Sequence, residues 1–235
     1  DNIRNFKLRY ESNTEKIEQI IQSNLNFLER EAIVDIANTI FDLEHKGIKG
    51  EFIEAGVANG GSAITIGLHK SLNRKLKLFD VYGMIPPPSK NDGEDIHKRY
   101  DVIKSGEAEG LNGDTYYGYK ENLLQQVKDS FIKFGLRPEE NNIEFIKGLY
   151  QDTMENKINF PVAFAHIDCD WYDSVMVCLN NIIPHLVENG VLIIDDYYCW
   201  SGCKKAVDEY FSDKKDLFVF VKKSRLHIVK KDNNV

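Results

Sequence analysis

The sequence predicts an α/β fold, with a mostly parallel sheet covered by helices in a single domain spanning residues 1–235. Short apolar runs typical of buried strands alternate with segments in which apolar residues recur at helical spacing. This alternation favours right-handed crossovers between parallel strands. Two further apolar runs, near 217–222 and 225–230, are so close together that they predict a C-terminal antiparallel hairpin. No internal repeat and no interdomain linker interrupts the pattern.

The first part of the chain is predicted to be helical. Apolar residues recur at helical spacing across 14–46, so we expect residues 1–47 to form an N-terminal helical extension. The apolar run 50–55 leads into glycine-rich sequence, as a buried strand would, and a helix follows to about residue 71. The run 76–80 predicts the second strand.

Residues 82–113 break this regularity. They contain three consecutive prolines, five glycines and many charged residues, with little apolar periodicity. A loop this long inside a compact domain is unusual and is often functional. We expect a lid over a binding site, and a disordered surface insertion is the alternative.

Regular alternation returns after this segment. The predicted elements are a helix over 114–134, strands near 142–146 and 162–167, a helix over 173–183, a strand over 191–195 and a helix over about 202–211. The helix over 173–183 ends before Pro184, because a residue that precedes proline disfavours helical geometry.

Composition limits the class of protein. The 235 residues carry a formal net charge of −7, and 42% are hydrophobic and 29% charged, as in an ordinary soluble globular protein. This acidity argues against a nucleic-acid partner, because neutralising phosphates needs a basic surface. No run reaches the ~18 apolar residues of a membrane span, and no secretory signal opens the chain. The first residue is Asp1 rather than Met, which is compatible with trimming or with excision from a longer polypeptide.

The cysteines match no zinc or redox spacing. They are Cys169, Cys178, Cys199 and Cys203. Free thiols suit a reducing compartment, so we expect the protein to be cytoplasmic.

The first candidate site follows the first predicted strand. Its end, from Glu54 to Ser62, reads EAGVANGGS, and its glycines allow a sharp turn close to a ligand. The next strand ends in Asp80, whose carboxylate can accept both hydroxyls of a ribose. The spacing is not GxGxxG. A carboxylate at Glu54 would repel a pyrophosphate, but it would suit a cationic ligand such as S-adenosylmethionine (SAM).

A second candidate site lies at two later strand ends. One strand runs into Asp168 and Asp170, and the strand after Gly190 runs into Asp195 and Asp196. Strand ends joined by one crossover are neighbours at the ligand-binding edge of a sheet, so these carboxylates should crowd together. Crowded carboxylates repel unless a cation neutralises them, and Mg²⁺ prefers oxygen ligands. The alternative is that these residues cap the following helices.

Together these segments resemble the macrocin O-methyltransferase (TylF-type) family of Mg²⁺- and SAM-dependent sugar O-methyltransferases. The resemblance covers about residues 50–210. The ordered combination of Asp-x-Asp-x-Tyr-x-Ser with Gly-(x)4-Asp-Asp-Tyr is its most specific part. The matching segments are GEFIEAGVANGGSA, KLFDVYG, FIKGLYQDT, AHIDCDWYDSVMVCLNNIIPHL and GVLIIDDYYCWSGCKKAVDEY.

The resemblance implies a Rossmann-like class I SAM methyltransferase fold with a seven-stranded sheet, and it assigns roles to residues. It implies that Asp168, Asp195 and Asp196 are the Mg²⁺ ligands and that Asp170 is the general base. The residues implied in SAM binding are Glu54, Ala55, Gly56, Gly60, Gly61, Ser62, Asp80, Gly148 and Asp152. Family members methylate hydroxyls of deoxysugars on small natural products and are often dimers or tetramers.

Aromatic residues beside the acidic strand ends could contact the acceptor. They are Trp171, Tyr172, Tyr197 and Trp200. An aromatic floor for a sugar and ordinary buried packing are both compatible with them. The chain departs from the family at Val81-Tyr82-Gly83, and the segment 84–112 has no close family counterpart. The acceptor is therefore the least transferable inference.

Other functions stay open at this stage. A SAM-dependent enzyme that methylates a catechol or another diol would use the same metal chemistry. A SAM-fold module that binds a ligand without turnover is a second alternative, although clustered carboxylates are costly to keep without a use. A dinucleotide-dependent dehydrogenase is disfavoured by the glycine spacing.

Overall fold

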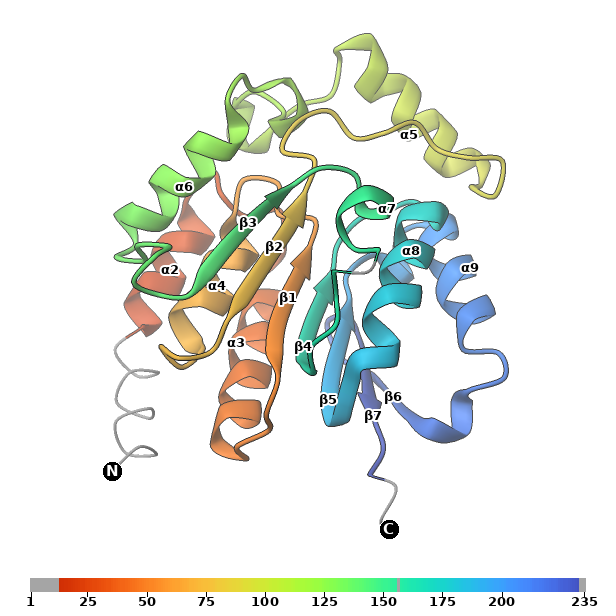
Figure 1. Cartoon of the computed structure of the whole chain (residues 1–235). Helices are drawn as coiled ribbons and strands as arrows, with labels where there is room; N and C mark the ends of the chain where they lie inside the picture. Colours follow the sequence, from red (N-terminus) through yellow and green to blue (C-terminus); the bar gives the residue numbers. More distant parts are fainter. Residues whose placement is uncertain (1–12, 156, 233–235) are drawn as a thin grey trace.

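Seven strands form one sheet in the order β3-β2-β1-β4-β5-β7-β6 (Figure 1). Strands β1 to β5 are parallel, and β7 runs antiparallel between β5 and β6. The strands are β1 (Glu51–Ala55), β2 (Leu76–Asp80), β3 (Ile143–Lys147), β4 (Val162–Ile167), β5 (Leu186–Ile194), β6 (Phe218–Lys222) and β7 (Leu226–Lys230). This computed structural model describes residues 13–155 and 157–232. It confirms the predicted mostly parallel sheet with a C-terminal hairpin.

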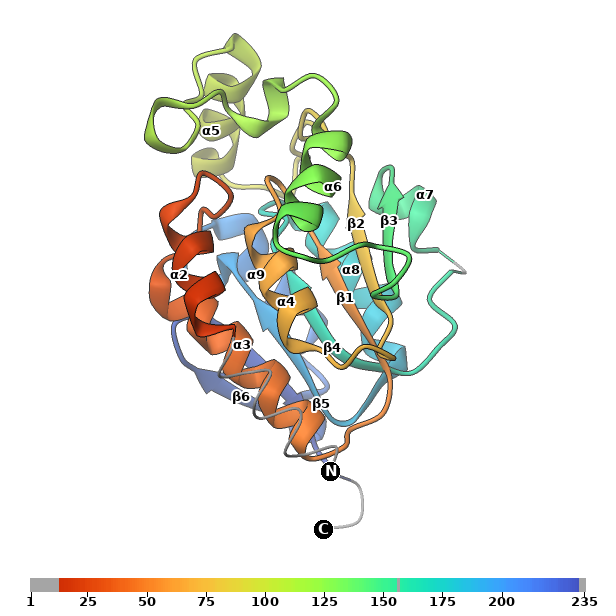
Figure 2. The same ribbon diagram turned by 90° about the vertical axis from the view of Figure 1, so that its left-hand side faces the viewer.

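Helices cover both faces of the sheet (Figures 1 and 2). Successive strand residues point to opposite sides, so Phe52 packs in one core and Ile53 in the other. The first core lies under α2 (Thr14–Gln22), α3 (Arg30–His45), α4 (Gly61–His69) and α6 (Leu123–Lys133). The second lies under α8 (Tyr172–Ile182) and α9 (Ser201–Tyr210), next to the short α7 (Tyr150–Thr153). No helix within the described ranges is long and apolar enough to cross a membrane.

Three predicted boundaries differ from the structure. The helix expected over 14–46 is two helices, α2 and α3, separated by a turn whose Leu25 carbonyl accepts a hydrogen bond from the Gly61 N–H at 2.8 Å. The part of the predicted extension before residue 13 lies outside the described residues. The helix expected from 114 begins at Leu123, because a 3₁₀ turn and the left-handed Asn122 (φ 55°) precede it. Strand β5 begins at Leu186, before Gly190.

The segment 82–113 is largely ordered rather than a disordered insertion, because it contains helix α5 (Glu94–Ser105) and is tied to neighbouring elements. Helix α5 lies beyond the carboxyl ends of the strands (Figure 2). The Trp171 indole N–H donates to the Pro86 carbonyl at 2.8 Å. The Asp92 carboxylate accepts from the Tyr172 N–H at 2.7 Å, at the first turn of α8. The Asp95 carboxylate accepts from the Ser201 N–H at 3.0 Å, at the start of α9. These two carboxylates supply caps that α8 and α9 lack locally.

Candidate functional site

A cavity of about 360 Å³ lies at the carboxyl ends of the parallel strands. The loops after β1, β2, β4 and β5 form its floor, and the α2–α3 turn and the segment around α5 form its walls. This is the position at which open α/β sheets bind ligands. The predicted site residues that line it are Gly56, Asp80, Asp168, Asp170, Asp195, Asp196 and Trp200.

The loop after β1 is in backbone contact with the loop after β4. Gly56 has φ +94°, and a Cβ at this position would lie 1.7 Å from the Asp168 carbonyl oxygen. The Asp168 N–H in turn donates to the Ala55 carbonyl at 2.8 Å. Only glycine fits here, because any side chain would push the two loops apart.

Asp80 organises the same loop from β2. Its carboxylate accepts three backbone hydrogen bonds, from Val57 at 2.6 Å, Ala58 at 3.1 Å and Tyr82 at 2.6 Å. Burial raises the pKa of Asp80, and the three N–H donors oppose that rise. Ala58 and Tyr82 are held at φ 46° and 47°. For non-glycine residues this conformation costs of order 1–3 kcal/mol and is often found at functional sites.

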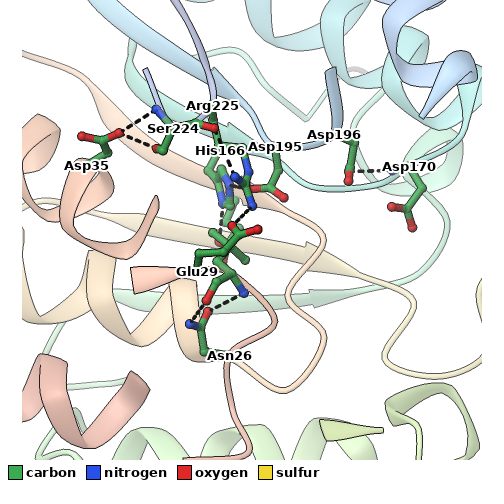
Figure 3. Close-up of polar contacts among 11 residues, drawn as sticks. Asn26, Glu29, Asp35, His166, Asp170, Asp195, Asp196, Ser224 and Arg225 are labelled. Atoms are coloured by element: carbon green, nitrogen blue, oxygen red, sulfur yellow. Dashed lines mark hydrogen bonds and ion pairs between the residues drawn. The ribbon is translucent and has the colours of Figure 1, made fainter. Parts of the chain in front are cut away.

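Three carboxylates converge at the ends of β4 and β5. One oxygen from each of Asp168, Asp170 and Asp196 lies within 4.8 Å of the others. The Asp170 N–H donates to Asp196 at 3.2 Å (Figure 3). Burial, reinforced by neighbouring carboxylates, raises the pKa values of Asp168 and Asp196 well above the usual range. Burial also raises the pKa of Asp170, to about 6.

This donor set fits a hard divalent cation. Octahedral Mg²⁺ with bonds of ~2.1 Å places neighbouring ligand oxygens about 3.0 Å apart and opposite ones about 4.2 Å apart. The grouping of Asp168, Asp170 and Asp196 within 4.8 Å is compatible with that geometry after small side-chain movements. A bound cation would also relieve the repulsion that raises their pKa values.

Asp195 has a different environment. Its carboxylate accepts from the Arg225 Nε–H at 2.8 Å and faces the His166 Nε2 at 3.6 Å (Figure 3). Arg225 also contacts Glu29 at 2.6 Å. Burial alone would raise the pKa of Asp195, but His166 and Arg225 hold it below its usual value. Asp168 and Asp195 form a second donor group with His166, so the implied ligands Asp168, Asp195 and Asp196 are divided between two overlapping groups that share Asp168.

Glu54 lies beneath the site and not in its wall. Its side chain is fully buried and lies 2.7 Å from the Nδ1 of His166. Burial opposes protonation of His166, but the charges and hydrogen bonds of Asp195 and Glu54 outweigh it and raise the pKa of His166 to about 10. In this structure Glu54 faces His166 and not the cavity, and burial raises the pKa of Glu54, so a role of Glu54 in binding a cationic ligand stays a prediction.

Several other predicted residues lie outside the cavity wall. Gly60, with φ +97°, precedes α4, and Gly61 and Ser62 form the first turn of that helix. Ala55, Gly148 and Asp152 are likewise not in the wall, although Leu149, Tyr150 and Gln151 are.

The predicted aromatic floor needs a correction, because three of its four members do not line the cavity. Trp171 is buried and holds Pro86, the Tyr172 hydroxyl donates to Glu209 at 2.5 Å, and the Tyr197 hydroxyl donates to Asp208 at 2.7 Å. These partners turn the side chains away from the site. Trp200 lines the cavity as predicted.

The aromatic wall comes mainly from elements that the sequence analysis did not assign to the site. The Tyr116 and Tyr117 rings lie 4.4 Å apart, and Phe27 makes an edge contact with Tyr117 at 5.7 Å. The run TYYGY at 115–119 was an available signal. Arg225 had none, because it lies in the turn of a distant hairpin and reaches the site by tertiary packing.

The fold and the site place this chain in a known class. The chain covers 99% of its length and 100% of the other chain when compared with the O-methyltransferase NovP, with a TM-score of 0.74 and 18% identity. The match to the calicheamicin methyltransferase CalS11 covers 98% of this chain, with a TM-score of 0.61 and 14% identity. The fold is that of the class I SAM-dependent methyltransferases. The chain belongs to the macrocin-O-methyltransferase (TylF) family, whose model matches residues 22–218.

Curated relatives of this chain are O-methyltransferases of natural products. The chain is 28% identical over 168 residues to the 8-demethyl-8-(2,3-dimethoxy-alpha-L-rhamnosyl)-tetracenomycin-C 4'-O-methyltransferase of Streptomyces olivaceus, covering 70% of this chain and 59% of the relative. It is 26% identical over 189 residues to the demethyldecarbamoylnovobiocin O-methyltransferase of Streptomyces niveus, covering 75% and 63%. The matches therefore span about three fifths of the length of these relatives.

Proposed function

We propose that this protein transfers a methyl group from SAM to a hydroxyl of a small-molecule acceptor, a sugar moiety of a natural product, with Mg²⁺ as the metal. The observation that carries the proposal is the convergence of four carboxylates, Asp168, Asp170, Asp195 and Asp196, which form two donor groups sharing Asp168 in the same cavity as the glycine loop after β1. Carboxylates this close, buried or half-buried, are costly unless a cation neutralises them. The relative from Streptomyces olivaceus is named for a rhamnosyl tetracenomycin, which supports a sugar acceptor.

SAM would lie across the loops after β1 and β2. Gly56 permits close approach of the backbone, and Asp80, which lines the cavity at the end of β2, would accept the ribose hydroxyls. Leu149 and Tyr150 line the same cavity, so Gly148–Asp152 would border the adenine. Gly60, Gly61 and Ser62 would act indirectly through the start of α4, and Ala55 and Glu54 by supporting the loop.

We assign Asp168, Asp195 and Asp196 as the residues that hold the metal and Asp170 as the general base. When bound, Mg²⁺ would supply a Lewis acid that lowers the pKa of the acceptor hydroxyl. Arg225 from the cavity wall and the fully buried His166 from beneath the cavity hold Asp195 ionised and oriented.

Asp170 is suited to the role of base by its pKa and its backbone. Burial raises its pKa to about 6, which is close to the value at which a general base works best near neutral pH. Its left-handed backbone (φ 55°) turns the side chain from the strand end into the cavity. Such a base typically contributes ~10²–10⁴-fold to the rate. The wall around α5 would exclude water from the reaction.

The test combines binding with chelation. Calorimetry should detect S-adenosylhomocysteine binding, and turnover of sugar acceptors should be lost on chelation and restored by Mg²⁺. A panel containing catechols decides between sugar and aromatic diols. Asp170→Asn is a suitable variant for testing the assigned base, because asparagine also tolerates the left-handed region of the backbone. It should lower kcat by ~10²–10⁴-fold, with unchanged affinity for S-adenosylhomocysteine.

Asp173→Asn is the matched control for this variant, because it removes an exposed carboxylate three positions away. It should leave kcat unchanged. Near-normal turnover of Asp170→Asn would show that the assigned base is wrong, and turnover in chelator would remove the metal from the proposal.

We also propose a cytoplasmic location and assembly as a homodimer or tetramer, without nucleic-acid or membrane partners. The described cysteines are all free, which supports a reducing compartment. Sedimentation of the purified chain measures the assembly directly.

A further inference from the structure

The acceptor side of the cavity contains a cation that the proposed mechanism does not use. Two cationic side chains, Arg99 and Arg225, are among the residues that line the cavity. Arg225 is already paired with two carboxylates, Asp195 at 2.8 Å and Glu29 at 2.6 Å. In the part of the chain that the structure describes, the Arg99 guanidinium has no hydrogen bond and no ion pair. Its central carbon lies 5.8 Å from the centroid of the Tyr116 ring.

Among the described residues no carboxylate forms an ion pair with Arg99, although Asp170 is close enough for the charge of Arg99 to lower its pKa. Ile85 and Ile103 pack with the Tyr116 ring in one apolar cluster that lines the cavity. A guanidinium carries five N–H donors and stays charged at all physiological pH values. A partly buried cation beside apolar side chains is unfavourable unless an anion pairs with it. The Asp170 carboxylate feels its charge but accepts no hydrogen bond from it.

The position of Arg99 is fixed by the fold. It lies on α5, whose preceding loop and first turn are held to α8 and α9 through Asp92 and Asp95. Ile96 and Ile103, one turn to each side, are buried. The guanidinium is therefore presented to the cavity by an anchored helix, and this preorganisation is what anion recognition requires.

We propose that Arg99 binds an oxyanion of the acceptor, a carboxylate or a phosphate, so that the acceptor is an acidic sugar and not a neutral glycoside. Guanidinium groups match both oxyanions with two parallel hydrogen bonds. The acidic group lies on the α5 side of the cavity, and the hydroxyl that is methylated lies at the carboxylates of β4 and β5. This inference rests on the proposed function, since it names the acceptor class of the same site.

Binding of three matched sugars tests the proposal. D-glucuronate, D-glucose 1-phosphate and D-glucose share a ring and differ in the oxyanion, and each is titrated into the full chain with Mg²⁺ and S-adenosylhomocysteine. We expect at least one acidic sugar to bind more tightly than glucose, and the identity of that sugar separates carboxylate from phosphate. Arg99→Gln should weaken its binding by about 10-fold to 100-fold, as expected for charged hydrogen bonds. Glucose affinity should change less than about threefold, because glucose has no anion to lose.

Lys98→Gln is the matched control, because it removes the same charge from the adjacent, 72% exposed residue of α5. It should leave the preference for the acidic sugar intact, and Arg99→Lys should retain part of it. The inference is overturned if neither acidic sugar binds the unaltered chain more tightly than glucose does. This includes the case in which none of the three sugars binds measurably. The same holds if Arg99→Gln and Lys98→Gln behave alike. S-adenosylhomocysteine binding in these samples tests the proposed function separately.

Discussion

Glu54 and His166 occupy paired positions on β1 and β4, and the Ile193 and His227 pairs continue the row across β5 and β7. Two histidines of this row, His166 and His227, differ in protonation at neutral pH, because their pKa values are shifted in opposite directions. Glu54 and Asp195 flank His166 and keep it charged, whereas His227 has no such flank and burial lowers its pKa to about 4. The charged histidine joins Glu54, beneath the loop after β1, to Asp195 of the acidic cluster.

His166→Gln should destabilise the protein by about 3–5 kcal/mol, because it leaves the Glu54 carboxylate buried without a cationic partner. Urea unfolding in the presence of chelator measures this loss. The double variant with Glu54→Gln should lose much less than the sum of the two single changes, because the residues are in contact. If the losses of the two single variants simply add in the double variant, or if His166→Gln loses less than about 1 kcal/mol, Glu54 and His166 do not form a stabilising ion pair.

The same pair predicts a dependence on alkaline pH. The pKa of His166 is raised to about 10 in the folded chain, against about 6.5 in the unfolded one. Its contribution is thus complete below pH ~6.5 and is lost as the pH rises toward 10. His166→Gln should flatten the fall in unfolding free energy over that range.

At the scale of elements, the segment around α5 gains its order from other parts of the chain. Asp92 reaches the start of α8, and Gly202 leaves room for it, since a Cβ there would lie 2.2 Å from the Asp92 oxygen. The sequence could not predict this helix. It buries only Ile96 and Ile103, which is too few for a helical apolar pattern, and the carboxylates that fasten it act on distant helices.

Asp92→Ala should loosen this segment, at a cost of about 0.5–2 kcal/mol for the lost cap of α8. We expect faster hydrogen exchange over residues 86–119 and a higher KM for the acceptor, with little change in affinity for S-adenosylhomocysteine. Glu94→Gln, on the exposed first turn of α5, is the control and should leave exchange unchanged. Unaltered exchange in Asp92→Ala would mean that Trp171 and Asp95 suffice to hold the segment.

At the scale of the whole molecule, the free energy of unfolding should fall on acidification, and part of this fall should come from the buried His227. Burial, aided by the charges of Lys223 and His166, lowers the pKa of His227 to about 4. Between pH ~6.5 and 4 the unfolded chain carries a proton on this residue that the folded chain lacks, so stability falls as the pH falls. His227→Gln should reduce that slope in pH-dependent urea unfolding. The exposed His97→Gln is the control, and an unchanged slope in His227→Gln would refute the assignment.

The sheet and its acidic edge were predictable from the sequence, because both depend on residues that are close together along the chain. Buried strands appear in the sequence as apolar runs; Asp80 is the last residue of one, and Asp168 and Asp195 directly follow two others. The walls of the cavity were not predictable in the same way. Arg99, Tyr116 and Arg225 reach it from a polar helix, an irregular turn and an edge hairpin, and their convergence depends on packing over long sequence separations.

The direct backbone contact between Gly56 and Asp168 fixes the distance between the loop after β1 and the loop after β4. That distance is therefore set by the spacing of adjacent strands. Under the proposed function, the chemistry thus rests on the two central strands of the sheet, and acceptor selection on the segment that contains α5. Redesign for new acceptors could therefore exchange residues between 84 and 119 while the reaction centre keeps its dimensions.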